Sequence, residues 1–83
     1  MPRTDTLRAA LTARDDEIEY YQINIDNYVR ALAKIEREHA GDSDMDKAMQ
    51  DFAVRLRDLL SSSLVEQRKA QIIRDVIAEQ LEG

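Results

Sequence analysis

The chain has 83 residues and no cysteine, which is the size of one small domain and excludes disulfides and cysteine-based zinc sites as sources of stability. Its formal net charge of −5 is unsuited to binding a phosphate backbone, so we expect no nucleic-acid partner. Charged residues make up 35% of the chain, and no apolar run approaches the ~20 residues that cross a bilayer, so we expect a cytoplasmic all-α protein without membrane contact.

The first predicted helix covers residues 4–40, with Thr4 or Asp5 as its N-cap. Its apolar and aromatic residues recur at alternating steps of four and three, which is the spacing of a coiled-coil-like seam. One series consists of Leu11, Ile18, Ile25 and Leu32, and the companion series consists of Leu7, Arg14, Tyr21, Tyr28 and Ile35. This spacing predicts that the helix packs along its whole length on another helix.

A turn is predicted at residues 41–43, where Gly41 can adopt the left-handed conformation that closes a helix. Ser43 or Asp44 can then cap a second helix over residues 44–82. Because the connection is short, the two helices should run antiparallel as a hairpin within a single domain, residues 1–83.

The second helix begins with one apolar face, formed by Met45, Met49, Phe52, Leu56 and Leu59. The serine run at residues 61–63 either kinks or breaks this helix, because serine side chains compete for backbone hydrogen bonds. We favour a continuous helix, which matches the first in length. The same seam then passes through Ser63, Glu66 and Ala70 before it reaches Ile73 and Ile77.

Beyond Ser63 the apolar face widens, since Val65, Ile72 and Val76 form a second stripe beside the seam. One partner helix cannot cover both stripes, so we predict a homodimer of hairpins packed as a helical bundle. The spacing does not say which residues pair within a chain and which pair between chains. The candidates for self-association are Leu11, Ile18, Tyr21, Ile25, Tyr28, Leu32, Val65, Ile72, Ile73, Val76 and Ile77.

Tyr20 and Ile23 lie three residues apart on the first helix, away from its seam. Such a pair is a docking site for a partner, part of a subunit interface, or an exposed pair without a role. Beside it lies the densest acidic cluster of the chain, Asp15, Asp16, Glu17 and Glu19. The cluster can dock on a basic protein surface, although charge runs on an outer helix face more often serve solvation.

Glu36 and His39 have the Glu-x-x-His spacing that resembles the metal-binding signature of ferritin-like bundle proteins. The favoured interpretation is that His39 is a seam residue near a helix carboxyl end, where a cationic imidazole is stabilised. With no cysteine, one histidine and no glycine-rich phosphate loop, we expect no metal, no cofactor and no enzymatic activity.

The chain is short, acidic and free of cysteine, has its helix break at Gly41, and contains the helix-forming stretch from Glu66 to Ala70. In these features it resembles the small helical proteins that bacteriophages encode to inhibit host machinery, among them anti-CRISPR proteins and quorum-sensing inhibitors. The leading hypothesis is therefore a protein–protein interaction module, a homodimer that binds and modulates an unidentified protein target. The alternatives are a structural scaffold or adaptor coiled coil and, less favoured, a metal-binding bundle.

Overall fold

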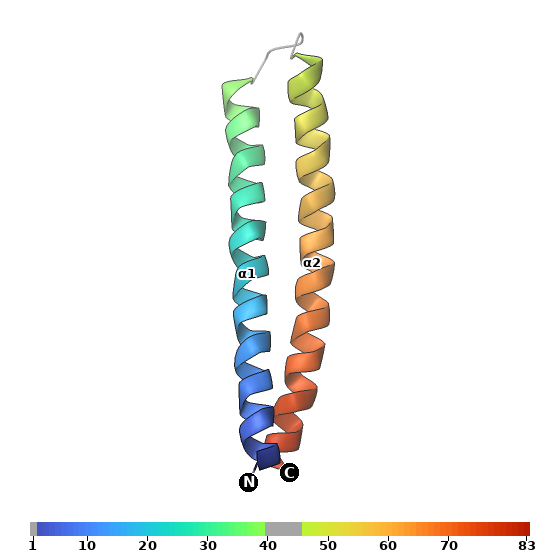
Figure 1. Ribbon diagram of the computed structural model, residues 1–83. Coiled ribbons are helices and arrows are strands. Elements are labelled where there is room, and N and C mark those ends of the chain that lie inside the picture. Colours follow the sequence, from blue (N-terminus) through green and yellow to red (C-terminus); the bar gives the residue numbers. More distant parts are fainter. Residues whose placement is uncertain (1, 40–45) are drawn as a thin grey trace.

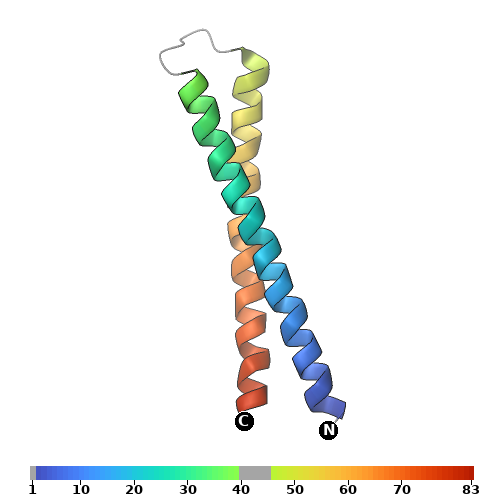
Figure 2. The ribbon, with the colours of Figure 1, turned by 90° about the vertical axis from the view of Figure 1, so that its left-hand side faces the viewer.

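The computed structural model describes residues 2–39 and 46–83, which form helix α1 (Pro2–Glu38) and helix α2 (Lys47–Glu82) without a strand. The helices lie side by side and run antiparallel, with both chain ends at the same end of the rod (Figure 1), so the predicted all-α hairpin is confirmed. The molecule measures 63 × 16 × 15 Å. Figure 2 shows the helices crossing near the middle of their length. In the described part of the chain, neither helix is both long and apolar enough to span a bilayer.

The helix ends differ from the predicted bounds by a few residues. α1 already begins at Pro2, where proline is well tolerated, and ends at Glu38. α2 begins at Lys47, because the carboxylate of Asp46 caps it by accepting a hydrogen bond from the backbone N–H of Ala48 at 3.2 Å. The predicted turn at 41–43 and the predicted caps Ser43 and Asp44 lie outside the described residues.

α2 is a single helix that continues through the serine run. Ser61, Ser62 and Ser63 are all helical, so the favoured prediction of continuity is confirmed and the alternative of a helix break is wrong. Ser63 is buried on the side that faces α1, whereas Ser61 and Ser62 are exposed. The helix is therefore held through the serines by packing against α1 rather than by helix propensity.

The seam predicted for α1 is the side that faces α2. Ile25 is buried, with 7% of its surface exposed, and it lies near the middle of the helix. The other members of both series are half-buried: Leu7, Leu11, Arg14, Ile18, Tyr21, Tyr28, Leu32 and Ile35. Heptad spacing located this contact because almost every seam position of α1 carries a large apolar or aromatic side chain.

The seam predicted for α2 is half right. The series that repeats every seven residues, namely Met49, Leu56, Ser63, Ala70 and Ile77, is buried or half-buried as predicted. The companion series was predicted as Phe52, Leu59, Glu66 and Ile73, but the structure uses Ala53, Leu60, Gln67 and Arg74, each one residue later.

Phe52 and Ile73 remain 47% and 48% exposed at the edge of the contact. The prediction is therefore wrong for these two residues, whereas Leu59 and Glu66 are half-buried. The rotation of α2 that the structure adopts brings Gln67 and Arg74 against polar groups of α1.

Candidate functional site

The interior of the hairpin is thin and partly polar. Among the described residues, the buried apolar side chains are Ile25, Ala53, Leu56 and Ala70, and no described side chain is fully buried. A domain of this size normally gains most of its stability from apolar burial. Much of the apolar surface of the chain therefore lies outside the contact between the helices.

Two polar contacts join the helices in the half of the hairpin nearest the chain ends. The Gln67 side-chain amide donates to the backbone carbonyl of Ile18 at 3.2 Å and to Gln22 Oε1 at 2.9 Å. Closer to the ends, Arg74 Nε donates to Asp15 Oδ1 at 2.9 Å. Hydrogen bonding to Asp15 and its negative charge raise the pKa of Arg74 above its ordinary value. These contacts fix how α2 is rotated against α1.

Tyr20 and Ile23 lie on the side of α1 that is turned away from α2. They are 60% and 54% exposed, although Tyr20 also packs its ring edge-on against Tyr21, with the ring centres 5.4 Å apart. Asp16 and Glu19 are exposed beside them at helical spacings that place all four on one side. We call Asp16, Glu19, Tyr20 and Ile23 the α1 outer face.

The predicted acidic cluster does not act as one surface. Asp15 is held by Arg74 of α2, and Glu17 pairs with Arg14 at 3.2 Å. Within the described residues, Asp16 and Glu19 enter no ion pair. The negative charge offered to a partner is therefore that of Asp16 and Glu19, which border the exposed tyrosine and isoleucine.

The carboxyl-terminal half of α2 carries a second exposed apolar surface. Val65, Ile72, Ile73 and Val76 are each close to half exposed, and we call them the α2 outer face. Of the other predicted self-association residues, Ile77 and those on α1 lie in the seam within the chain. Further exposed apolar residues that the sequence pattern did not single out are Val29, Val54 and Leu64. They fall outside the heptad series of the predicted stripes, so the periodic pattern did not mark them.

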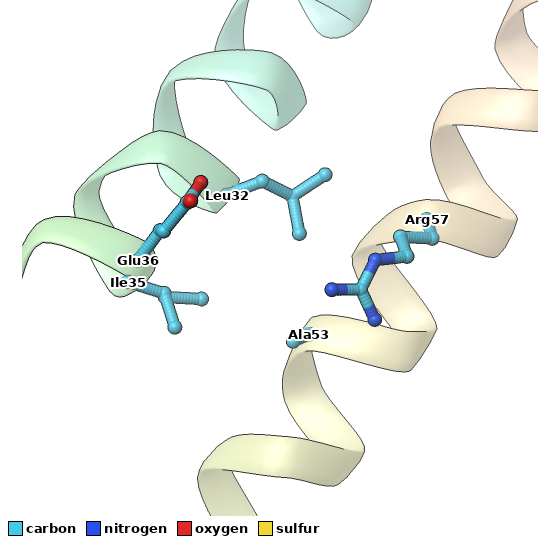
Figure 3. A pocket seen from close by; sticks show the side chains of 5 residues that line it. All are labelled: Leu32, Ile35, Glu36, Ala53 and Arg57. Atoms are coloured by element: carbon cyan, nitrogen blue, oxygen red, sulfur yellow. The ribbon is translucent and has the colours of Figure 1, made fainter. Parts of the chain in front are cut away.

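A hollow of about 310 Å³ opens between the helices near their connected end (Figure 3). Leu32 and Ile35 reach from α1 toward α2, where Ala53 is too small to fill the space opposite them. Glu36 and Arg57 line the rim, and no ion pair joins these two described side chains. The hollow results from the small side chain of Ala53 in the seam.

The Glu-x-x-His pair lies at the carboxyl end of α1. Glu36 lines the hollow, and His39 is half-buried just after the last helical residue, with its backbone N–H bonded to the carbonyl of Ile35 at 3.0 Å. Across the described residues, no group of three or more histidine, aspartate or glutamate side chains is placed to hold a metal ion.

No family model, curated protein or solved structure matches the chain. The exposed faces therefore carry the functional interpretation.

Proposed function

We propose that the chain is a protein–protein interaction module, a small acidic helical homodimer that binds and modulates a protein target through the α1 outer face. The observation that carries this proposal is the exposure of Tyr20 and Ile23, 60% and 54%, on the side of α1 opposite the seam. An aromatic and a branched aliphatic residue, side by side on a rigid helix, form a typical anchor for a protein contact.

The chemistry of the face indicates what kind of surface it binds. Tyr20 and Ile23 suit an apolar recess, and the neighbouring carboxylates of Asp16 and Glu19 suit lysine or arginine side chains at its rim. Because the backbone of this segment is already helical, binding requires little ordering of the chain. The proposed partner is thus a protein with a basic-rimmed apolar groove that accepts a helix.

The test is a double substitution, Tyr20→Asp with Ile23→Asp. Because both side chains point away from α2, the variant should keep its helical circular dichroism and lose the proteins that the wild-type chain retains in affinity capture. The matched control is Ala9→Asp with Ala13→Asp, which adds the same charge at exposed positions of α1 nearer its amino end.

Retention of the same proteins by the double variant would contradict a docking role for Tyr20 and Ile23. Loss of helicity in the variant, with the control still folded, would instead place both residues in a packed interface.

The rod shape favours a second candidate, a structural scaffold or adaptor. A molecule of 63 × 16 × 15 Å with exposed apolar residues on both helices can join neighbours on two sides. A scaffold would form species larger than a dimer as its concentration rises, and sedimentation velocity distinguishes that behaviour from a fixed dimer.

A metal-dependent bundle is ruled out for this chain if His39→Ala leaves the metal content of the purified protein unchanged.

A further inference from the structure

In the carboxyl-terminal half of α2, the distribution of apolar side chains between the two sides of the helix is the reverse of the usual one. The side that faces α1 carries Ser63, Gln67 and Ala70, which are buried, while the opposite side carries the larger residues of the α2 outer face. An amphipathic helix whose only neighbour is α1 would bury its largest aliphatic side chains against that neighbour. The α2 outer face therefore has the composition of a surface that is covered.

The α2 outer face has room for an interface of standard size. The surface of the chain is 6320 Å², above the value of about 5,100 Å² for a compact monomer of this mass, 9.6 kDa, because the molecule is a rod of 63 × 16 × 15 Å. A protein interface of standard size takes ~800 Å² from each subunit, and the side of a rod of this length can supply that area.

The α2 outer face has the spacing of a seam. Val65, Lys69, Ile72 and Val76 follow one another at steps of four, three and four, and Ile73 borders this stripe. Lys69 is compatible with the stripe, because its ammonium group is held at 3.0 Å by Glu66 and its methylene groups can lie along the apolar surface. The stripe can therefore pack against a helix of the same kind.

The charges along one edge of the stripe indicate that the partner helix is the same segment of a second copy. Arg68 and Asp75 are both exposed and precede Lys69 and Val76 by one residue, so they lie on the same edge. When two identical helices pack antiparallel, this edge meets its own copy, and Val65 lies opposite Val76. Arg68 then lies close to Asp75 of the second copy, and the two-fold symmetry repeats the pair.

We propose that the α2 outer face binds a second copy of this chain, antiparallel and two-fold symmetric, with Arg68 of each chain opposite Asp75 of the other. The inference rests on the self-association in the proposed function and assigns it to the carboxyl-terminal half of α2. The α1 outer face lies on the opposite side of the rod, so the dimer leaves Tyr20 and Ile23 available to a target.

The test is a charge exchange followed by sedimentation equilibrium over a series of concentrations. Arg68→Glu and Asp75→Arg should each raise the dissociation constant of the dimer at least about tenfold, because each places like charges together twice. The double variant, Arg68→Glu with Asp75→Arg, should restore the dissociation constant to within about threefold of wild type, since the charges are then opposite again.

The matched controls are Arg55→Glu and Asp51→Arg, which make the same exchanges at exposed positions of α2 that lie at least ten residues before Val65. They should leave the dissociation constant unchanged, and circular dichroism should show that every variant is helical.

Three results would overturn the proposal: a wild-type chain that stays monomeric, a dimer insensitive to both single exchanges, and a double variant no tighter than the single ones. A monomeric wild type would also remove the homodimer from the proposed function, whereas the other two results would leave it in place. Capture of a target through Tyr20 and Ile23 is measured independently, so the docking role is tested separately from the dimer contact.

Discussion

Between Ser63 and Ile77, the two sides of α2 differ in residue type, and the difference is not the one expected for a helix that packs only on α1. The inner side carries small and polar residues until it reaches Ile77, whereas the outer side carries Val65, Ile72 and Val76 around Lys69. On α1 the order is the usual one, with Ile25 buried and polar residues such as Gln22 and Asp26 exposed. The contrast is that the seam side of α1 is lined with large apolar residues, whereas α2 keeps much of its aliphatic surface outside the hairpin.

The largest effect on stability is expected at Leu56, because the two sides of α2 differ only if its seam residues hold the hairpin together. Leu56 is 5% exposed in the seam, so Leu56→Ala should lower the free energy of unfolding by about 2–4 kcal/mol. Val54, two residues earlier, is 53% exposed, and Val54→Ala should change it by less than about 0.5 kcal/mol. Urea unfolding followed by circular dichroism measures both, and equal losses would mean that the two sides of α2 are not different.

The next largest effect is expected at Gln67, on the side of α2 that faces α1. Here the substitution should raise the free energy of unfolding, not lower it. Gln67→Leu removes two hydrogen bonds, but it buries an apolar side chain, and Gln22 is exposed enough to bind water instead. The free energy of unfolding should rise by about 1 kcal/mol, as buried polar groups often give way to apolar ones at a gain. A lower urea midpoint would show that these hydrogen bonds contribute more than the added apolar burial.

The outer side should matter little to one hairpin on its own. Because Ile72 points away from α1, Ile72→Gln should change the free energy of unfolding of the dilute chain by less than about 0.5 kcal/mol. At high concentration the wild type should melt at a higher temperature than this variant, since association stabilises the folded chain by mass action. A large loss of stability at low concentration would place Ile72 in the core of the single chain.

The sequence was sufficient to locate one helix face and not the other. On α1, Leu11, Ile18, Ile25 and Leu32 leave only one apolar stripe to choose, so periodicity finds the contact. On α2 the heptad series that begins at Met49 can be completed by either of two neighbouring sets of residues. The set with the larger side chains includes Phe52 and Ile73, but these two residues are exposed in the structure. Apolar spacing alone favours the larger side chains, because it contains no information about partners.

The deciding contacts on α2 are polar and join residues far apart in the chain, as Gln67 does with Gln22. No local pattern predicts such a pair. At the candidate site, helical spacing correctly predicted that Tyr20 and Ile23 lie off the seam. It did not predict that Asp15 pairs with Arg74 and Glu17 with Arg14, which leaves Asp16 and Glu19 as the exposed acids of the cluster that enter no ion pair within the described residues.

The smallest effect on stability is expected from the ion pair between Asp15 and Arg74. Its size measures how much this polar contact between the helices stabilises the hairpin. Asp15→Asn keeps an acceptor for Arg74 but removes the charge, at a site where both side chains are well exposed to water and salt. The urea midpoint should fall slightly, and the difference should disappear at about 1 M salt. Asp16→Asn, the exposed neighbour without an ion pair in the described part of the chain, should leave the midpoint unchanged.

The pH dependence of this ion pair follows from the direction of the Arg74 shift. A base whose pKa is raised on folding contributes stability below its unfolded pKa and loses it as the pH rises through the folded pKa. Since an arginine stays protonated far above neutrality, its titration should add no slope to stability between about pH 6 and 10. A fall in stability over that range in the wild type but not in an Arg74→Gln variant would contradict this. A contribution this small also means that the ion pair alone does not set the rotation of α2 against α1.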